Sequence, residues 1–151
     1  MRLANCSARA RRTNLEDVDM TRHASCSCGQ LKADCEGEPV RISVCHCLDC
    51  QRRTGSVFGF QAHFPRRQVA ASGRASKFTR TADSGNAVTF SFCPDCGTTL
   101  YWEPQAFPDR ITVAAGAFAD PDFPAPRHSV YEERHHSWVV IATGAEIEHL
   151  D

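Results

Sequence analysis

The chain has 151 residues, a length that suits one domain, and its composition is that of a globular protein, with 42% hydrophobic and 23% charged residues. Its formal net charge of −1 gives no electrostatic reason to bind a nucleic-acid backbone or an anionic membrane, so neither is expected as a partner. No run of apolar residues approaches the roughly 18 that a membrane-spanning helix needs.

The first 20 residues differ from the rest of the chain. They are rich in arginine and lack the apolar segment of a secretory signal peptide. We expect residues 1–20 to form a poorly ordered leader, with Met20 as an alternative start, and we place the domain at residues 21–151. With no export signal and many thiols, the predicted location is the cytoplasm.

From residue 21 the sequence has the pattern of a series of short strands separated by glycine and proline. This pattern predicts an all-β domain. The expected strands lie within residues 23–28, 30–37, 41–47, 56–64, 75–80, 87–92, 98–102 and 110–118.

Two local patterns add detail to this prediction. Val88, Phe90 and Phe92 alternate with polar residues and are expected to share a buried face. The segment 48–55 is the one expected helix, with Asp49 as its N-cap and Gly55 just past its end.

The cysteines are the most informative feature of the chain. There are nine, an odd number, and seven of them lie in three tight clusters. Spacing this close favours metal binding, because a disulfide stabilises more when it closes a longer loop. A disulfide scaffold and an iron–sulfur cluster are the alternatives.

Two of the clusters together supply four thiolates. Residues two apart in a strand point to the same side, so Cys26 and Cys28 can converge on one ion. Cys93 and Cys96, followed by Gly97, form the tight knuckle of zinc ribbons, in which the glycine takes a positive φ. Four thiolates are the complete ligand set of a structural zinc site.

The third cluster is CHCLDC, residues 45–50, which supplies Cys45, Cys47 and Cys50 and turns His46 away. Three protein ligands leave one position of a zinc ion open, as in catalytic sites. A fourth side chain that closes this site is the alternative. The candidates are Cys35, His63, His128, His135 and His136, although Cys35 is typical of a buried apolar thiol and the last two histidines of a surface.

The motifs CSCG (26–29), CHCLDC (45–50) and CPDCG (93–97), in this order, resemble those of the glutathione-dependent formaldehyde-activating enzymes, a family grouped with centromere protein V. FCPDCGTTLYW (92–102) and GAFADP (116–121) extend the resemblance, which covers roughly residues 21–140.

This resemblance implies a mainly β, β-tent fold of stacked antiparallel sheets with zinc knuckles. It implies two zinc ions per chain: a structural one on Cys26, Cys28, Cys93 and Cys96, and a catalytic one on Cys45, Cys47 and Cys50. The implied activity joins formaldehyde and glutathione to S-hydroxymethylglutathione, a carbon–sulfur lyase reaction in the reverse sense.

Three other residues are predicted to serve this site. Arg52 and Arg53 follow Cys50 and are expected to offset the negative charge of the thiolates, and His128 matches a family position and is expected to line the site. Trp138 is expected in the core.

The leading prediction is therefore a zinc-dependent lyase that acts on adducts of a small aldehyde with glutathione or a similar small thiol. A binding module with two structural zinc ions and a thiol-redox or metal-handling protein are the alternatives.

Overall fold

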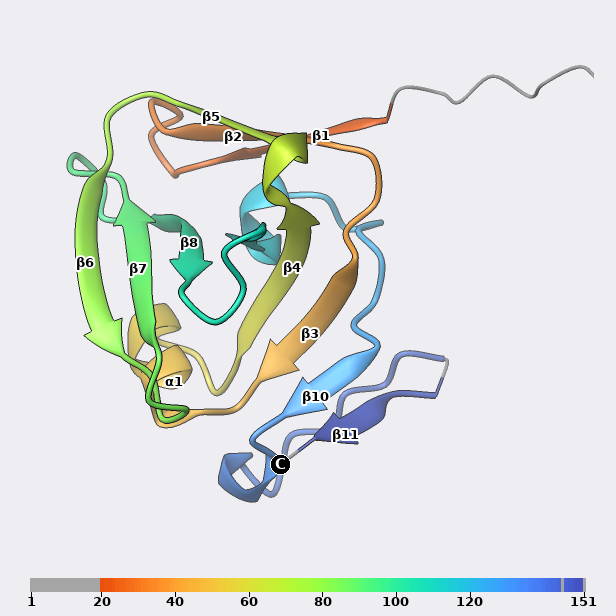
Figure 1. Cartoon of the computed structure of the whole chain (residues 1–151). Helices are drawn as coiled ribbons and strands as arrows, with labels where there is room; N and C mark the ends of the chain where they lie inside the picture. Colours follow the sequence, from red (N-terminus) through yellow and green to blue (C-terminus); the bar gives the residue numbers. More distant parts are fainter. Residues whose placement is uncertain (1–19, 145, 151) are drawn as a thin grey trace, which may run out of the picture.

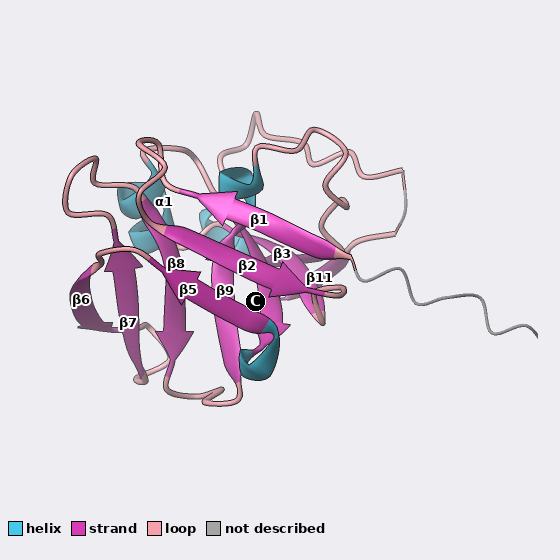
Figure 2. Ribbon diagram, turned by 90° about the horizontal axis from the view of Figure 1, so that it is seen from above, coloured by secondary structure: helices cyan, strands magenta, loops and turns pink. Residues whose placement is uncertain are grey.

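The computed structural model describes residues 20–144 and 146–150, which form two stacked β-sheets (Figures 1 and 2). The smaller sheet is antiparallel, has the order β1-β2-β5, and consists of β1 (Thr21–Ser25), β2 (Lys32–Glu36) and β5 (Val69–Ser72).

The larger sheet has eight strands in the order β11-β10-β3-β4-β9-β8-β7-β6. They are β3 (Arg41–Cys45), β4 (Gly59–Pro65), β6 (Ser76–Thr81), β7 (Ala87–Phe92), β8 (Thr99–Pro104), β9 (Arg110–Ala114), β10 (His128–Val130) and β11 (Glu148–Leu150). One α-helix, α1 (Leu48–Thr54), and the 3-10 helices η1 (Arg66–Gln68), η2 (Ala115–Phe118) and η3 (Glu132–Arg134) complete the described part of the chain.

The predicted mainly β fold of stacked sheets with one short helix is confirmed. Most of the predicted leader lies outside the described residues. No helix in residues 20–144 and 146–150 is long and apolar enough to cross a membrane.

The core lies between the two sheets. Because successive side chains of a strand point to opposite faces, Ala62 and Phe64 of β4 face the small sheet together with Val113 of β9. They pack against Ala33 and Cys35 of β2. Figure 2 shows the small sheet crossing over this face of the large one.

The large sheet departs from a purely antiparallel arrangement at one edge. β10 runs parallel to both β3 and β11, because the chain reaches this edge through a long connection instead of a hairpin. The register places His128 beside Ser43 and Val130 beside Cys45.

The second face of the large sheet carries polar and aromatic side chains. In Figure 1, α1 lies near the lower ends of β6 and β7. Residues directly opposite each other in register share a face. One such row crosses six strands and consists of Arg41, His63, Thr112, Trp102, Phe90 and Phe78.

The expectation of a buried Val88, Phe90 and Phe92 face is only partly correct. Phe90 is buried, whereas Val88 and Phe92 are half-buried. Ser91, on the opposite side of β7, is fully buried. β7 is therefore covered on both sides, and a simple alternation does not describe it.

Candidate functional site

The start of α1 brings three thiols together, which we call the helix cluster: Cys45, Cys47 and Cys50. Cys45 ends β3, Cys47 is the N-cap of α1, and Cys50 lies in its first turn. Their sulfur atoms lie within 4.8 Å of one another, and all three residues are buried.

The helix is capped by Cys47, so the predicted N-cap, Asp49, is wrong. The Sγ atom of Cys47 accepts a hydrogen bond of 3.3 Å from the amide of Cys50. Asp49 lies in the first turn of the helix, where its carboxylate pairs with Arg80 at 2.9 Å and with Arg52 at 3.5 Å. Gly55 ends the helix in the left-handed conformation, as predicted.

Close packing against β4 fixes the helix cluster. A Cβ atom on Gly59 would lie 2.9 Å from Nη2 of Arg53 and 3.3 Å from Cβ of Cys50. A side chain at residue 59 would therefore displace the Arg53 guanidinium and crowd Cys50.

The helix cluster faces a cavity of about 170 Å³, which we call the thiol cavity. Its polar wall includes Gln61, His63 and Arg80, and its apolar wall includes Val88, Phe90, Trp102, Phe107 and Tyr131. This volume holds a small aldehyde and one sulfur atom, and it is far below the roughly 300–1,000 Å³ of sites that enclose larger ligands.

The electrostatics of the helix cluster concentrate negative charge on Cys47. Its pKa is lowered to about 2, because the thiols of Cys45 and Cys50 donate hydrogen bonds to it and because the Cys50 amide and Arg80 lie close. The pKa of Cys45 is raised, since its thiol serves as donor to Cys47 and is buried. A buried anionic sulfur between two further thiols is a suitable donor set for a cation.

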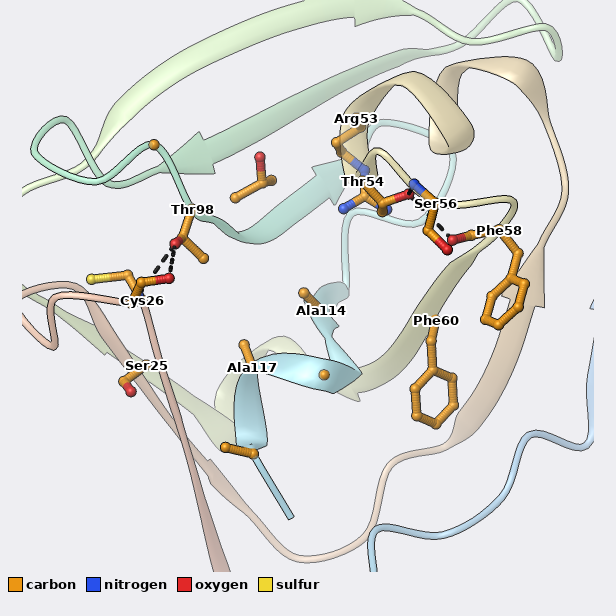
Figure 3. Close-up of a pocket in the computed structure, with 15 residues that line it drawn as sticks. Ser25, Cys26, Arg53, Thr54, Ser56, Phe58, Phe60, Thr98, Ala114 and Ala117 are labelled. Atoms are coloured by element: carbon orange, nitrogen blue, oxygen red, sulfur yellow. Dashed lines mark hydrogen bonds between the residues drawn. The ribbon is translucent and has the colours of Figure 1, made fainter. Parts of the chain in front are cut away.

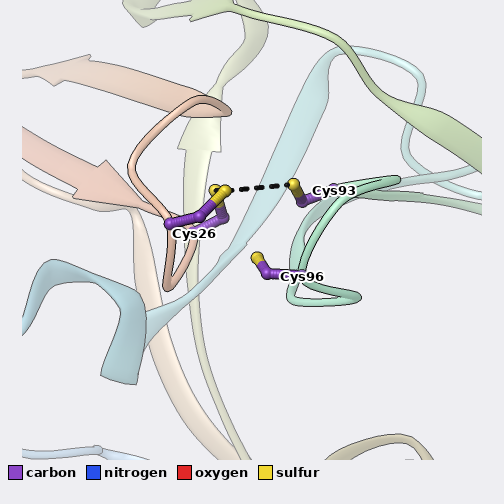
Figure 4. A group of neighbouring side chains, drawn as sticks. Cys26, Cys93 and Cys96 are labelled. Carbon is purple, nitrogen blue, oxygen red and sulfur yellow. Dashed lines mark hydrogen bonds between the residues drawn. The ribbon is translucent and has the colours of Figure 1, made fainter.

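The second group, the knuckle cluster, joins the two sheets. It consists of Cys26 and Cys28 after β1 and of Cys93 and Cys96 between β7 and β8 (Figure 4). The Sγ atom of Cys28 lies 3.5 Å from that of Cys26 and 3.6 Å from that of Cys93. A regular tetrahedron of sulfur around zinc, with Zn–S of about 2.3 Å, has edges of about 3.8 Å, so the donors fit this ion.

Hydrogen bonds to the sulfur atoms support the knuckle cluster. The side-chain amide of Gln30 donates to Sγ of Cys93 at 2.9 Å, and the backbone amide of Leu31 donates to Sγ of Cys26 at 3.3 Å. The pKa of Cys96 is lowered to about 5, because Thr98 donates to its sulfur. Gly97 has a φ of 75°, which confirms the predicted knuckle conformation.

Both clusters could hold metal ions, and they are the two groups of three or more possible ligands in the described residues. Each of the eight cysteines in this part of the chain is a free thiol. The structure therefore brings together the seven predicted ligands in the predicted partition, and their role as ligands remains a prediction.

The candidates for a fourth ligand lie elsewhere. Within residues 20–144 and 146–150, no histidine, acidic residue or further cysteine joins the three sulfur atoms of the helix cluster. Cys35 lies in the core between the sheets, and His135 and His136 are exposed. His63 lines the thiol cavity, but its ring is held by Thr112 at 3.0 Å and Ser43 at 3.4 Å.

Of the three other predicted site residues, Arg53 lies close to the helix cluster, whereas Arg52 is exposed and His128 points elsewhere. The Arg52 side chain is 75% exposed. Arg53 lies 4.3 Å above the ring centroid of Trp102 and close to Cys50. His128 points to Glu148, at 3.2 Å, and does not line the thiol cavity.

Two further expectations concern aromatic rings. The ring of His46 turns away from the thiols and lies 3.2 Å from the hydroxyl of Ser129. Trp138 is 72% exposed, so its predicted place in the core is wrong, and its described ring contact is with His136.

Two residues of the site were missed in the sequence. Arg80 lies beside Cys47 and reaches the cavity because β6 pairs with β7; its alternation with Phe78 was a weak signal. Tyr131 packs against the helix cluster and has a φ of 57°. This strained conformation is typical of functional sites and has no signal in the sequence.

A larger cavity, of about 710 Å³, extends from the end of α1 to Cys26 of the knuckle cluster (Figure 3). Arg53 and Thr54 lie at one end and Cys26 and Thr98 at the other. Its wall is rich in hydroxyl groups, and Arg53 is the one charged residue among the described residues that line it.

Comparisons with known proteins agree with this geometry. The family model described as glutathione-dependent formaldehyde-activating enzyme matches residues 21–134. No curated protein matches the chain in sequence. Among solved structures, the fold resembles that of a Rhodobacter sphaeroides protein from a structural genomics programme, with a TM-score of 0.52 and 13% sequence identity over 84% of this chain and 98% of that one.

Proposed function

Since this chain belongs to the family of glutathione-dependent formaldehyde-activating enzymes, we propose that it joins glutathione or a similar small thiol to formaldehyde and cleaves the S-hydroxymethyl adduct in reverse, as a carbon–sulfur lyase. The observation that carries this proposal is the helix cluster: three buried thiols at the wall of a small cavity, with no fourth protein ligand in the described part of the chain.

The metal assignment follows from the donor sets. The knuckle cluster would hold a structural zinc ion, and Cys45, Cys47 and Cys50 would hold a catalytic one. Zinc bound to the helix cluster would favour the thiolate form of an incoming thiol near neutral pH. Arg80, beside Cys47, and Arg53, beside Cys50, offset the negative charge that three cysteine thiolates and a substrate sulfur bring together.

The thiol cavity would orient the two reactants. The substrate sulfur attacks the carbonyl carbon, the new C–S bond forms, and the π electrons of the C=O bond move to oxygen, which then takes a proton. Trp102, Phe90 and Val88 keep water away from this step. Holding the sulfur next to the carbonyl replaces a bimolecular encounter by a fixed geometry.

Tyr131 is the proposed hydrogen-bond donor to the developing oxyanion. Burial raises the pKa of its phenol, with the neighbouring Cys45 as a second cause, so the hydroxyl remains protonated at neutral pH. A protonated donor beside the apolar wall of the cavity stabilises the charge that appears on oxygen.

The test is the exchange rate between free glutathione and its S-hydroxymethyl adduct, measured by exchange NMR with ¹³C-formaldehyde. The wild-type protein should accelerate this exchange above the spontaneous rate, and Cys47→Ser should abolish the acceleration. Cys35→Ser, which removes a thiol outside both clusters, is the control and should leave it intact. A spontaneous rate in the presence of fully metallated wild type contradicts the lyase proposal.

A further inference from the structure

A groove of about 730 Å³ lies on the outer side of the helix cluster, and we call it the arginine groove. It runs between α1 and the paired strands β6 and β7. Its lining residues are Asp49, Arg52, Arg53, Phe78, Arg80, Thr81, Phe90, Phe92 and Thr99.

The arginine groove adjoins the thiol cavity. Asp49, Arg80 and Phe90 line both, so these three side chains form the wall between them. The Asp49–Arg80 ion pair, at 2.9 Å, is the polar part of this wall. A ligand whose reactive end entered the thiol cavity beside this pair would leave its remaining atoms in the groove.

The sizes of the two spaces support such a division. The thiol cavity, about 170 Å³, is too small for a tripeptide. The arginine groove, about 730 Å³, falls within the range of roughly 300–1,000 Å³ that encloses small-molecule ligands.

The charge of the arginine groove is unbalanced. Three guanidinium groups line it, against the single carboxylate of Asp49, which Arg52 and Arg80 share. No ion pair of Arg53 with a carboxylate is found in the described residues, and its Nε and Nη2 atoms are buried there without a hydrogen-bond partner. Its guanidinium is held by Trp102, 4.3 Å away, so it is a fixed cation with spare charge.

The other side of the groove is apolar. Phe78 is 59% exposed and lies opposite Phe90 in register, with Phe92 two pairs further along, opposite Ser76. An exposed phenylalanine next to arginines suits a ligand that has both carboxylates and an apolar or peptide backbone.

We propose that the arginine groove binds the carboxylate-bearing body of the thiol substrate, with Arg53 as its main anion partner, so that the enzyme selects anionic peptide thiols over neutral ones. This inference rests on the proposed function for the place of the sulfur. Arg53 and Phe78 are then specificity-determining residues, because they contact the part of the substrate that does not react.

The test uses a ligand that cannot react. S-methylglutathione keeps both carboxylates but has no thiol, and its dimethyl ester lacks the negative charges. Calorimetric titration of the zinc-loaded protein should show binding of the acid and at least tenfold weaker binding of the ester. The Arg53→Gln substitution should weaken binding of the acid about tenfold and leave the affinity for the ester unchanged.

Two further variants guard against loss of folding. Arg52→Glu changes an exposed residue of the groove and should also weaken binding of the acid, whereas Arg67→Gln, an exposed arginine in η1 outside the groove, should not. Equal binding of acid and ester overturns the proposal, as does unchanged affinity in both groove variants or no binding of S-methylglutathione.

The outcomes separate the two proposals. If glutathione exchange with formaldehyde is accelerated but S-methylglutathione binding does not depend on Arg53 or Arg52, the groove proposal is wrong and the lyase proposal stands. If S-methylglutathione binds through Arg53 while the exchange rate stays spontaneous, the groove is a binding site and the lyase proposal is wrong.

Discussion

The knuckle cluster and the helix cluster are built from the same side chain but differ in reach. Cys28 and Cys93 are separated by 65 residues, so the knuckle cluster ties the first hairpin to a late turn. The helix cluster takes its three thiols from residues 45–50 and ties together only the end of β3 and the first turn of α1. A metal bound at the first site would staple the fold, and one bound at the second would close a short loop.

The two clusters also differ in what surrounds their sulfur atoms. Thr98, Gln30 and Leu31 occupy the outside of the knuckle cluster with hydrogen bonds to its sulfur atoms. The helix cluster borders an open cavity with an arginine and a tyrosine. Ligand type alone therefore does not assign a role. The sequence separation of the ligands and the space beside them do.

Removal of a knuckle ligand should have the largest effect. In Cys96→Ala the four-thiol site loses one metal ligand. Because metal binding there would be coupled to folding, the fold would lose up to about 10 kcal/mol of metal-binding free energy. This exceeds the stability of many domains. We expect almost no soluble protein, judged by soluble yield and thermal melting.

Cys35→Ala is the matched control for that variant. Its thiol is fully buried, whereas that of Cys96 is exposed, but it lies in neither cluster, so we expect a soluble protein with a free energy of unfolding lower by about 1 kcal/mol. A soluble Cys96→Ala protein with a cooperative melt and wild-type melting temperature would contradict the structural role of the knuckle cluster.

Removal of a helix-cluster ligand should cost less. The Cys47→Ser variant retains a good N-cap, because the serine hydroxyl can accept the hydrogen bond from the Cys50 amide that the Cys47 sulfur accepts in the wild type. We expect a folded protein with one zinc ion per chain in place of two and a modestly lower melting temperature. Elemental analysis and calorimetry check this. Two retained zinc ions would show that another side chain completes the helix cluster.

The third prediction concerns the open position of a metal at the helix cluster. Without substrate, seven sulfur ligands and one lighter atom would surround two zinc ions, an average of about 3.5 sulfur atoms per ion. Glutathione should raise this average to about 4 in a zinc-edge absorption spectrum, and more so at higher pH, because thiolate binding releases a proton. Oxidised glutathione is the control and should leave the spectrum unchanged. An all-sulfur spectrum without added thiol would contradict the open site.

The smallest expected effect concerns His63, in the wall of the thiol cavity. Burial is the main cause that lowers its pKa to about 4, with Arg41 and Arg110 as further causes. The unfolded chain binds a proton near the ordinary histidine pKa of about 6.5, whereas the folded chain keeps His63 neutral. The contribution of neutral His63 to the free energy of unfolding is therefore fully present above about pH 6.5 and is lost as pH falls from about 6.5 towards 4.

His63→Gln should remove this pH dependence. Between about pH 7.5 and pH 6 the wild type should lose about 1 kcal/mol more unfolding free energy than the variant. The exposed His135→Gln is the control and should follow the wild type. If urea titrations gave the same pH dependence of the unfolding free energy for the wild type and His63→Gln, His63 would not be held neutral in the folded protein.

The cysteine partition was predictable because it depends on short spacings. Cys93 and Cys96 with Gly97 define their own turn, and three thiols in residues 45–50 cannot be far apart. The predictions that were wrong relied on average preferences. Aspartate is a more common N-cap than cysteine, yet the Cys47 sulfur occupies that position, and tryptophan is usually buried, yet Trp138 is not.

The remaining site residues depend on strand register, which no local pattern gives. Arg80 reaches Cys47 because β6 pairs with β7 at the edge of the large sheet. Tyr131 reaches the helix cluster because β10 joins β3, and the pairing of β10 with β11 places His128 beside Glu148. Such pairings arise from the packing of the whole sheet.

The parallel pairing of β3 with β10 also determines when the thiol cavity is completed during synthesis of the chain. The helix cluster lies within residues 45–50 and can form soon after they leave the ribosome. The part of the cavity wall formed by Tyr131 can form only after residues 128–131 have emerged and β10 has paired with β3. This contact has a high sequence separation and therefore forms slowly. A growing chain therefore carries its reactive thiols uncovered for the time that about 80 further residues need, which is about 4–16 seconds at typical rates of synthesis.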